Sequence, residues 1–311
     1  PGDETVAGGL RSSVRVSEVW AGLTLARGLG EHVGLGISTF FSFRSQGGED
    51  QLFVQARTQA DDFALLYEID NYDLSSYGVL WKVGLGLDLR PITAGLTVTT
   101  PTVRVGGSGT ATVNETRVGV DLDGDGIADD GFVTDIQTDV RASHRSPLSI
   151  GAGAAWHLPR SRIHVAAEWF GAVGAYDILE LQPFVSQETG EPVQRQLRNA
   201  AAAVVNVALG FEHTFSDSYT GFLGINTDRS THDPASDVAT TTYDLVHLSG
   251  GAKLDLKKVR FNLGLRYAWG DQTVERKLDL NPEAGRLLED FESVEVEFKQ
   301  LTLILGFAFN I

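Results

Sequence analysis

Apolar residues alternate with small or polar residues along much of this chain, and the last segment, 298–311, shows the pattern best. Its apolar positions are Leu301, Leu303, Leu305, Phe307, Phe309 and Ile311. The positions between them are small or polar, with Ile304 as the one large apolar exception. Because successive side chains of a strand point to opposite faces, this segment predicts a strand with one strongly apolar face. A small and polar opposite face favours a transmembrane barrel strand over a soluble sheet.

The same alternation recurs in ten earlier segments of the chain. They are 14–27, 33–43, 77–90, 92–98, 148–156, 163–169, 205–215, 219–226, 246–256 and 259–269. Short turns at 28–31, 90–91, 158–161, 216–218 and 257–258 alternate with long loops, as in outer-membrane barrels. The sequence therefore predicts an all-β protein, a transmembrane antiparallel β-barrel of the outer-membrane type with about 12–14 strands, in the bacterial outer membrane.

The domain organisation follows from where the alternation stops. Residues 1–12 are predicted to be a polar tail or loop, and residues 13–311 a single barrel domain. A long Asp-rich hairpin insertion is expected at 106–146, and residues 45–61 are interpreted as mainly loop. If the C-terminus lies in the periplasm, the first strand descends. Since bacterial barrels have an even number of strands, a further ascending strand before Pro1 is expected.

Composition narrows the class of function. The chain has 41 acidic and 25 basic residues, and the net charge of −16 argues against a nucleic-acid partner. The absence of cysteine excludes thiol catalysis and thiolate metal sites. No run of apolar residues is long enough for a transmembrane helix. The histidines lack metal-ligand spacing and no nucleophile-elbow motif occurs, so we expect no enzyme; a phospholipase-like barrel is the less favoured enzyme alternative.

One acidic stretch has the pattern of a calcium loop, with carboxylates alternating with glycines. Its candidate ligands are Asp121, Asp123, Asp125, Ile127, Asp129 and Asp130. Hard cations such as calcium prefer oxygen ligands of this kind. Position twelve is Phe132 rather than a bidentate glutamate, so the loop is not a complete EF-hand. An acidic, solvated hairpin tip remains the alternative, and no other cofactor is required.

Several large side chains fall on the inward positions of the expected strands. The apolar ones are Trp20, Phe40, Leu80, Phe170, Phe222 and Ile304. They could line the path of an apolar ligand, or they could pack against a plug or fill the lumen. The inward cations Lys82, Arg260 and Arg266 could meet a ligand carboxylate. They could equally pair with the inward acids Asp88, Glu168 or Glu212.

A repeated unit consists of a strand, a short polar turn and a strand that opens with alternating apolar and glycine residues. It occurs at 81–101 (WKVGLGLDLRPITAGLTVTTP), 146–170, 205–228 and 248–269. This unit resembles the FadL-type family of outer-membrane transporters for long-chain fatty acids and hydrocarbons, over about residues 14–311. The resemblance implies a 14-stranded monomeric barrel with an N-terminal plug, in which ligands pass to an opening in the barrel wall. The sequence lacks the Asn-Pro-Ala motif of that plug.

Two functions are consistent with these observations. The inward apolar residues favour passive uptake of hydrophobic small molecules such as long-chain fatty acids. The long loops and the missing plug motif favour a structural or scaffold FadL-like barrel that holds partner proteins in an outer-membrane complex. The expected partners are therefore membrane lipid, a hydrophobic small-molecule ligand and proteins bound through the long loops.

Overall fold

The computed structural model describes residues 5–57, 63–119, 127–128, 130–238, 243–256, 259–274 and 294–309. These residues are organised in antiparallel strands. No helix among them is long and apolar enough to cross a membrane. The strands are β1 (Thr5–Leu29), β2 (Val33–Arg57), β3 (Phe63–Leu89), β4 (Ile92–Thr99), β5 (Val103–Val118), β6 (Gly131–Arg141), β7 (Ser149–His157), β8 (Ser161–Phe170), β9 (Val173–Asp177), β10 (Phe184–Val185), β11 (Pro192–Val193), β12 (Arg198–Ala201), β13 (Val204–Ser216), β14 (Tyr219–Asp228), β15 (Leu245–Leu256), β16 (Val259–Val274) and β17 (Val294–Phe309).

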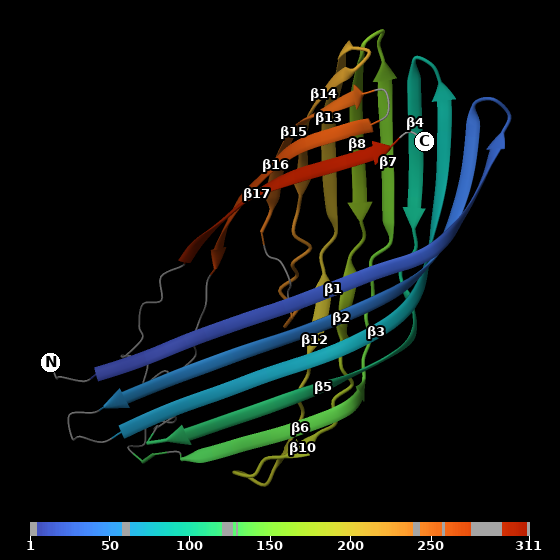
Figure 1. Cartoon of the computed structure of the whole chain (residues 1–311). Helices are drawn as coiled ribbons and strands as arrows, with labels where there is room; N and C mark the ends of the chain where they lie inside the picture. Colours follow the sequence, from blue (N-terminus) through green and yellow to red (C-terminus); the bar gives the residue numbers. More distant parts are fainter. Residues whose placement is uncertain are drawn as a thin grey trace.

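One antiparallel sheet of 13 strands organises the molecule. Its main path runs β1-β2-β3-β4-β7-β8-β13-β14-β15-β16-β17, and β5 and β6 continue from β3. Figure 1 shows β4, β7, β8 and β13–β17 as a curved wall, with β1–β3 running along it and bending away. This is the predicted all-β architecture of the outer-membrane barrel type. Within the described residues, β1 and β17 are the two ends of the main path and do not pair with each other.

Strand pairing places the apolar positions of neighbouring strands on one common face. Leu263 pairs with Leu305 and Leu265 with Leu303, and these side chains are exposed. The alternate positions bring Asn262 opposite Gly306. In a membrane barrel the exposed apolar face meets lipid, and the small and polar face lines the inside. The apolar positions of the last two strands therefore share one face as predicted, and we call the opposite, small and polar face the inner face.

The first strands extend well beyond the wall, which corrects two sequence-based expectations. Residues 5–12, expected in a polar tail, belong to β1 and pair with 50–57 of β2. Residues 45–57, expected to be mainly loop, pair with both β1 and β3. Polar side chains hide the alternation here, but backbone hydrogen bonds between strands do not require apolar side chains. β5 and β6 pair as a hairpin at the far side of this extension.

The extension carries its own small hydrophobic core. Tyr72 and Leu74 of β3 and Ala111 of β5 pack against Ile178 and Leu179, which follow β9. The core also contains Ala142, Tyr176, Leu181, Leu197 and Val238. The connections that join β8 to β13 and β14 to β15 thus fold onto the extension. We call this assembly the cap. It comprises residues 5–17, 45–57, 63–78, 103–118, 130–142, 171–203 and 229–238.

Candidate ligand passage on the inner face

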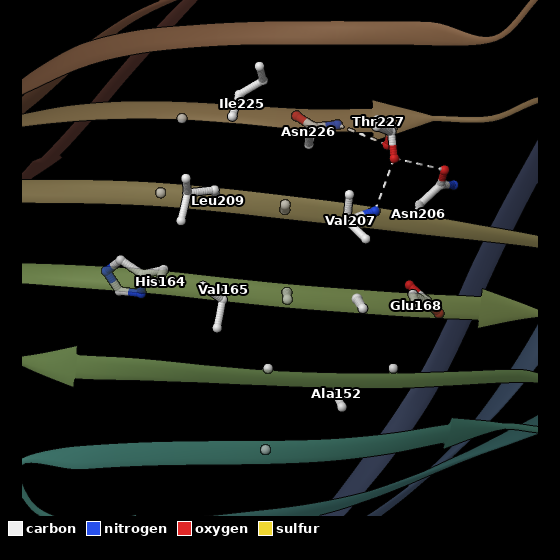
Figure 2. A pocket seen from close by; sticks show the side chains of 18 of the residues that line it. Ala152, His164, Val165, Glu168, Asn206, Val207, Leu209, Ile225, Asn226 and Thr227 are labelled. Carbon is white, nitrogen blue, oxygen red and sulfur yellow. Dashed lines mark hydrogen bonds between the residues drawn. The ribbon is translucent and has the colours of Figure 1, made fainter.

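The inner face of the wall is hollowed because its residues are unusually small. Gly151, Gly153, Ala166, Ala208 and Gly210 lie on it in neighbouring strands β7, β8 and β13. They line a pocket of about 670 Å³ that reaches from β4 to β15 (Figure 2). Glycine and alanine keep the lumen open, since larger inward side chains would fill it. A sheet of this kind can hold a small molecule against its inner side.

Polar side chains mark the two ends of this pocket. Toward one end Thr227 bridges two strands, because its hydroxyl donates to Asn206 Oδ1 at 3.3 Å and accepts from the Val207 amide at 3.0 Å (Figure 2). Glu168 lies near that end and accepts a 2.8 Å hydrogen bond from the Ser149 hydroxyl. His164 lies toward the other end. The apolar floor therefore lies between groups that can hydrogen-bond.

An adjoining pocket of about 420 Å³ is more apolar, and Phe222 of β14 and Ile304 of β17 stand on its two sides. Register places Phe222 next to Gly251, Gly251 next to Gly264, and Gly264 next to Ile304. The four residues form one row across four strands. We call this row and the space above it the slot. Both large side chains are exposed to the lumen and offer apolar surface to a ligand.

A second apolar group lies on the inner face of β1–β3. Phe40 pairs with Leu80, and the Trp20 and Phe40 rings are 5.8 Å apart between centroids. Leu80 is fully buried. Phe170 lies apart from this group, on β8 between Ser149 and Val204. All six inward apolar residues of the sequence-based prediction are on the inner face, but the structure gathers them in separate places.

The three inward cations have different surroundings. The guanidinium of Arg260 donates to Asp255 at 2.5 Å, an acid that sequence reasoning did not consider. Arg266 is the cross-strand neighbour of Ser249, which lines both pockets, and its buried Nε lacks a hydrogen-bond partner. Lys82 lies between Ser38 and Thr99. Among the described side chains, no carboxylate is within ion-pair distance of Lys82 or Arg266.

A polar network separates the cap from the Trp20–Phe40–Leu80 group. Glu18 accepts hydrogen bonds from Trp20 Nε1 at 2.6 Å, and from Arg44 at 2.8 Å. Arg44 also donates to Gln46, whose amide donates to the Tyr72 hydroxyl at 3.0 Å. The network thus joins an aromatic side chain of the lumen to a core residue of the cap.

His144 reaches this network from the connection between β6 and β7. Its Nε2 lies 3.8 Å from Glu18 Oε2. Burial, together with the nearby Arg44 cation, lowers the pKa of His144 to about 4, although Glu18 acts in the opposite direction. Deeper in the cap, burial and the neighbouring Glu115 and Asp70 carboxylates raise the pKa of Glu68. Glu68 in the cap and His144 beside the network are therefore ionisable groups whose neutral forms are favoured.

The proposed calcium ligands fall largely outside the described residues, which omit Asp121, Asp123, Asp125 and Asp129. Ile127 is exposed, and the Asp130 carboxylate accepts a hydrogen bond from the Gly119 amide. In the part of the chain that the structure describes, no group of three or more His, Cys, Asp or Glu is arranged to hold a metal ion. The calcium loop stays a prediction.

Sequence reasoning missed the residues that shape the pockets. Gly251, Gly264 and Gly210 are inward by the same alternation that identified Phe222. The sequence does show glycine at inward positions of successive strands, which could have indicated these pockets. Only the strand register, however, shows that the glycines lie in one row. The Glu18–Arg44 contact spans 26 residues, and no local pattern marks it.

Comparison with known proteins identifies the fold. No protein-family model and no curated protein sequence matches this chain. A FadL homologue from Pseudomonas aeruginosa superposes with a TM-score of 0.52 at 11% identity, covering 95% of this chain and 67% of the homologue. The Pseudomonas putida toluene transporter TodX gives a TM-score of 0.44 at 12% identity, covering 87% and 84% of the two chains. The CymD monoaromatic hydrocarbon channel gives 0.44 at 13% identity, covering 85% and 83%.

These similarities concern the fold alone, because the identities are low. The superposition on the FadL homologue shows that this chain has the FadL-type barrel fold. The resemblance noted in the repeated strand–turn–strand units is confirmed at that level.

Proposed function

We propose that this FadL-type barrel is an outer-membrane channel for passive uptake of hydrophobic small molecules. The observation that carries the proposal is the hollowed inner face, where a floor of glycine and alanine adjoins the slot between Phe222 and Ile304. Apolar ligands gain about 0.8 kcal/mol for each methylene removed from water, so a passage must offer contiguous apolar wall. The structural neighbours named as transporters or channels of toluene and monoaromatic hydrocarbons support the same proposal.

Long-chain fatty acids are a finer form of this proposal. A fatty acid needs a cation for its carboxylate, and Arg266 is suited to that role because it lies beside Ser249 and has no acidic partner among the described residues. Arg260 is less suited because Asp255 already neutralises it. Charge-assisted hydrogen bonds from an arginine to a carboxylate are stronger than neutral ones.

The test is uptake of labelled oleate by cells that produce the protein, compared with cells that lack the gene. Phe222→Asp and Phe170→Asp should each reduce the protein-dependent uptake, because a carboxylate on the apolar wall must be desolvated as the ligand passes. Phe222→Leu keeps an apolar side chain at the same position and should retain uptake. Unchanged uptake in both aspartate variants and in the deletion strain would refute transport of this ligand.

The scaffold function is the second candidate, and the outer face of the cap favours it. Phe53 and Tyr67 pair across β2 and β3 with ring centroids 6.3 Å apart, and Phe132 lies in the same row on β6. All three rings are exposed. Exposed aromatic residues are enriched where proteins bind partners. We further propose that calcium binds at 121–130, between β5 and β6.

A further inference from the structure

We propose that Gly264 keeps the floor of the slot clear, and that the slot therefore takes ligands whose apolar part is about one aromatic ring wide. This inference rests on the proposed transport function and concerns which ligands can pass. It assigns a specificity-determining role to a residue that has no side chain.

The row geometry defines the shape of the slot. Phe222 and Ile304 stand three strands apart, which is about 14 Å between backbones at the usual strand spacing. Gly251 and Gly264 form the floor between them. Along β15 and β16 the next inward residues are polar, and Ser249 and Asn262 line the pocket on either side. Successive inward residues are about 7 Å apart along a strand, so the apolar floor is one row high.

The backbone does not explain why position 264 is glycine. A Cβ added there would meet no atom closer than Ile304 Cβ, at 3.6 Å, which is ordinary van der Waals contact. Its φ is not in the left-handed region. Gly251 differs, because a Cβ there would lie 2.6 Å from the carbonyl oxygen of Leu263. Glycine weakens a strand interior, and often marks a site that another group approaches closely. Gly251 is required by packing, whereas the space above Gly264 is left for a ligand.

The height of the apolar floor along the strands then selects the ligand, and Gly264 keeps that floor clear. A flat ring or an unbranched chain can lie on Gly251 and Gly264 with its edges toward Phe222 and Ile304. A broader apolar group would reach the polar rows of Ser249 and Asn262 and separate them from water without offering hydrogen bonds. Any side chain at position 264 occupies the same space and should narrow the slot in proportion to its size.

The experiment measures uptake of labelled p-xylene and of the broader 1,3,5-triisopropylbenzene by cells that produce the protein. Wild-type protein should pass p-xylene, and pass the broader molecule at least about tenfold more slowly. Gly264→Leu should reduce p-xylene uptake about tenfold or more because it overpacks the slot. The matched control is Gly250→Leu, on the adjacent strand but on the lipid-facing side, where an added Cβ meets only Leu223 Cδ1 and Phe222 O at 3.8 Å. This control should retain p-xylene uptake.

Two further variants keep the test decisive if Gly264→Leu fails to reach the membrane. Gly264→Ala adds one methyl group that the structure accommodates and should give a smaller loss of p-xylene uptake. Ile304→Ala in the Gly264→Ala background should restore uptake by freeing space on the other side of the slot. If wild-type cells take up no more p-xylene than cells without the protein, the proposed transport function itself is refuted. Two results would overturn this inference while leaving transport in place. One is that wild-type cells take up p-xylene and all position-264 variants take it up as fast as Gly250→Leu does. The other is that the wild-type protein passes 1,3,5-triisopropylbenzene as fast as p-xylene.

Discussion

Replacing Glu18 by alanine should destabilise the junction between the cap and the wall. The Glu18 carboxylate accepts hydrogen bonds from Trp20, from Ser42 at 2.9 Å and from Arg44 at 2.8 Å. The side chains of Arg44 and Glu18 are only 13% and 21% exposed. The substitution therefore leaves a largely buried guanidinium without its counter-charge and releases the indole that packs on Phe40.

The burial of this pair decides the expected magnitude. Removing one partner of a buried ion pair costs about 3–5 kcal/mol, and the partial exposure here lowers our expectation to about 2–4 kcal/mol. The pair between Arg141 and Glu180 is a matched control, because its nitrogen–oxygen distance is 3.3 Å but its side chains are 59% and 52% exposed. Glu180→Ala should therefore cost no more than about 1 kcal/mol.

Urea unfolding of the reconstituted protein, followed by tryptophan fluorescence, measures both free energies. A double-mutant cycle with Glu18→Ala and Arg44→Ala isolates the interaction between the two side chains. Combined replacement should cost less than the sum of the single losses, because no buried charge is then left alone. The reasoning is refuted if Glu18→Ala costs no more than Glu180→Ala.

Three further predictions can be checked independently. A spin label at Leu263 should be more accessible to lipid-soluble oxygen than one at Asn262, and the reverse order would contradict the assignment of faces. Calcium should protect the 121–130 loop from proteolysis, and Asp125→Ala should abolish that protection; no calorimetric binding at millimolar calcium would favour the acidic-tip alternative. His144 has a folded-state pKa of about 4, below its unfolded value, so its contribution to stability is present near neutral pH and is lost as pH falls from about 6.5 toward 4. As pH falls over that range, the cap of the wild-type protein should become more sensitive to proteolysis, and the cap of the His144→Gln variant should change less. Equal changes in the two proteins would contradict a lowered pKa for His144.

The sequence alone determined which way the side chains of the wall point. A strand has a side-chain period of two, so alternation in 259–269 and 301–311 predicted one apolar face without knowledge of any neighbour, and the described part of both segments has it. The same reasoning placed Phe222 and Arg266 on the inner face, where the structure has them. Short turns and long loops likewise revealed the barrel class, because both are local features.

Only the tertiary structure decided which residues share a row. Ile304 is far from Gly251 and Gly264 in the chain, and the three residues share a row because the register of three strands aligns them. The register depends on many weak contacts along whole strands, so no short segment encodes it. The cap was missed for a related reason, since its strands are polar and its core forms from connections that lie far apart in sequence. Ion pairing was decided in the same way. Arg260 pairs with Asp255 on the neighbouring strand, whereas Arg266 meets no acid among the described residues and lies beside the slot.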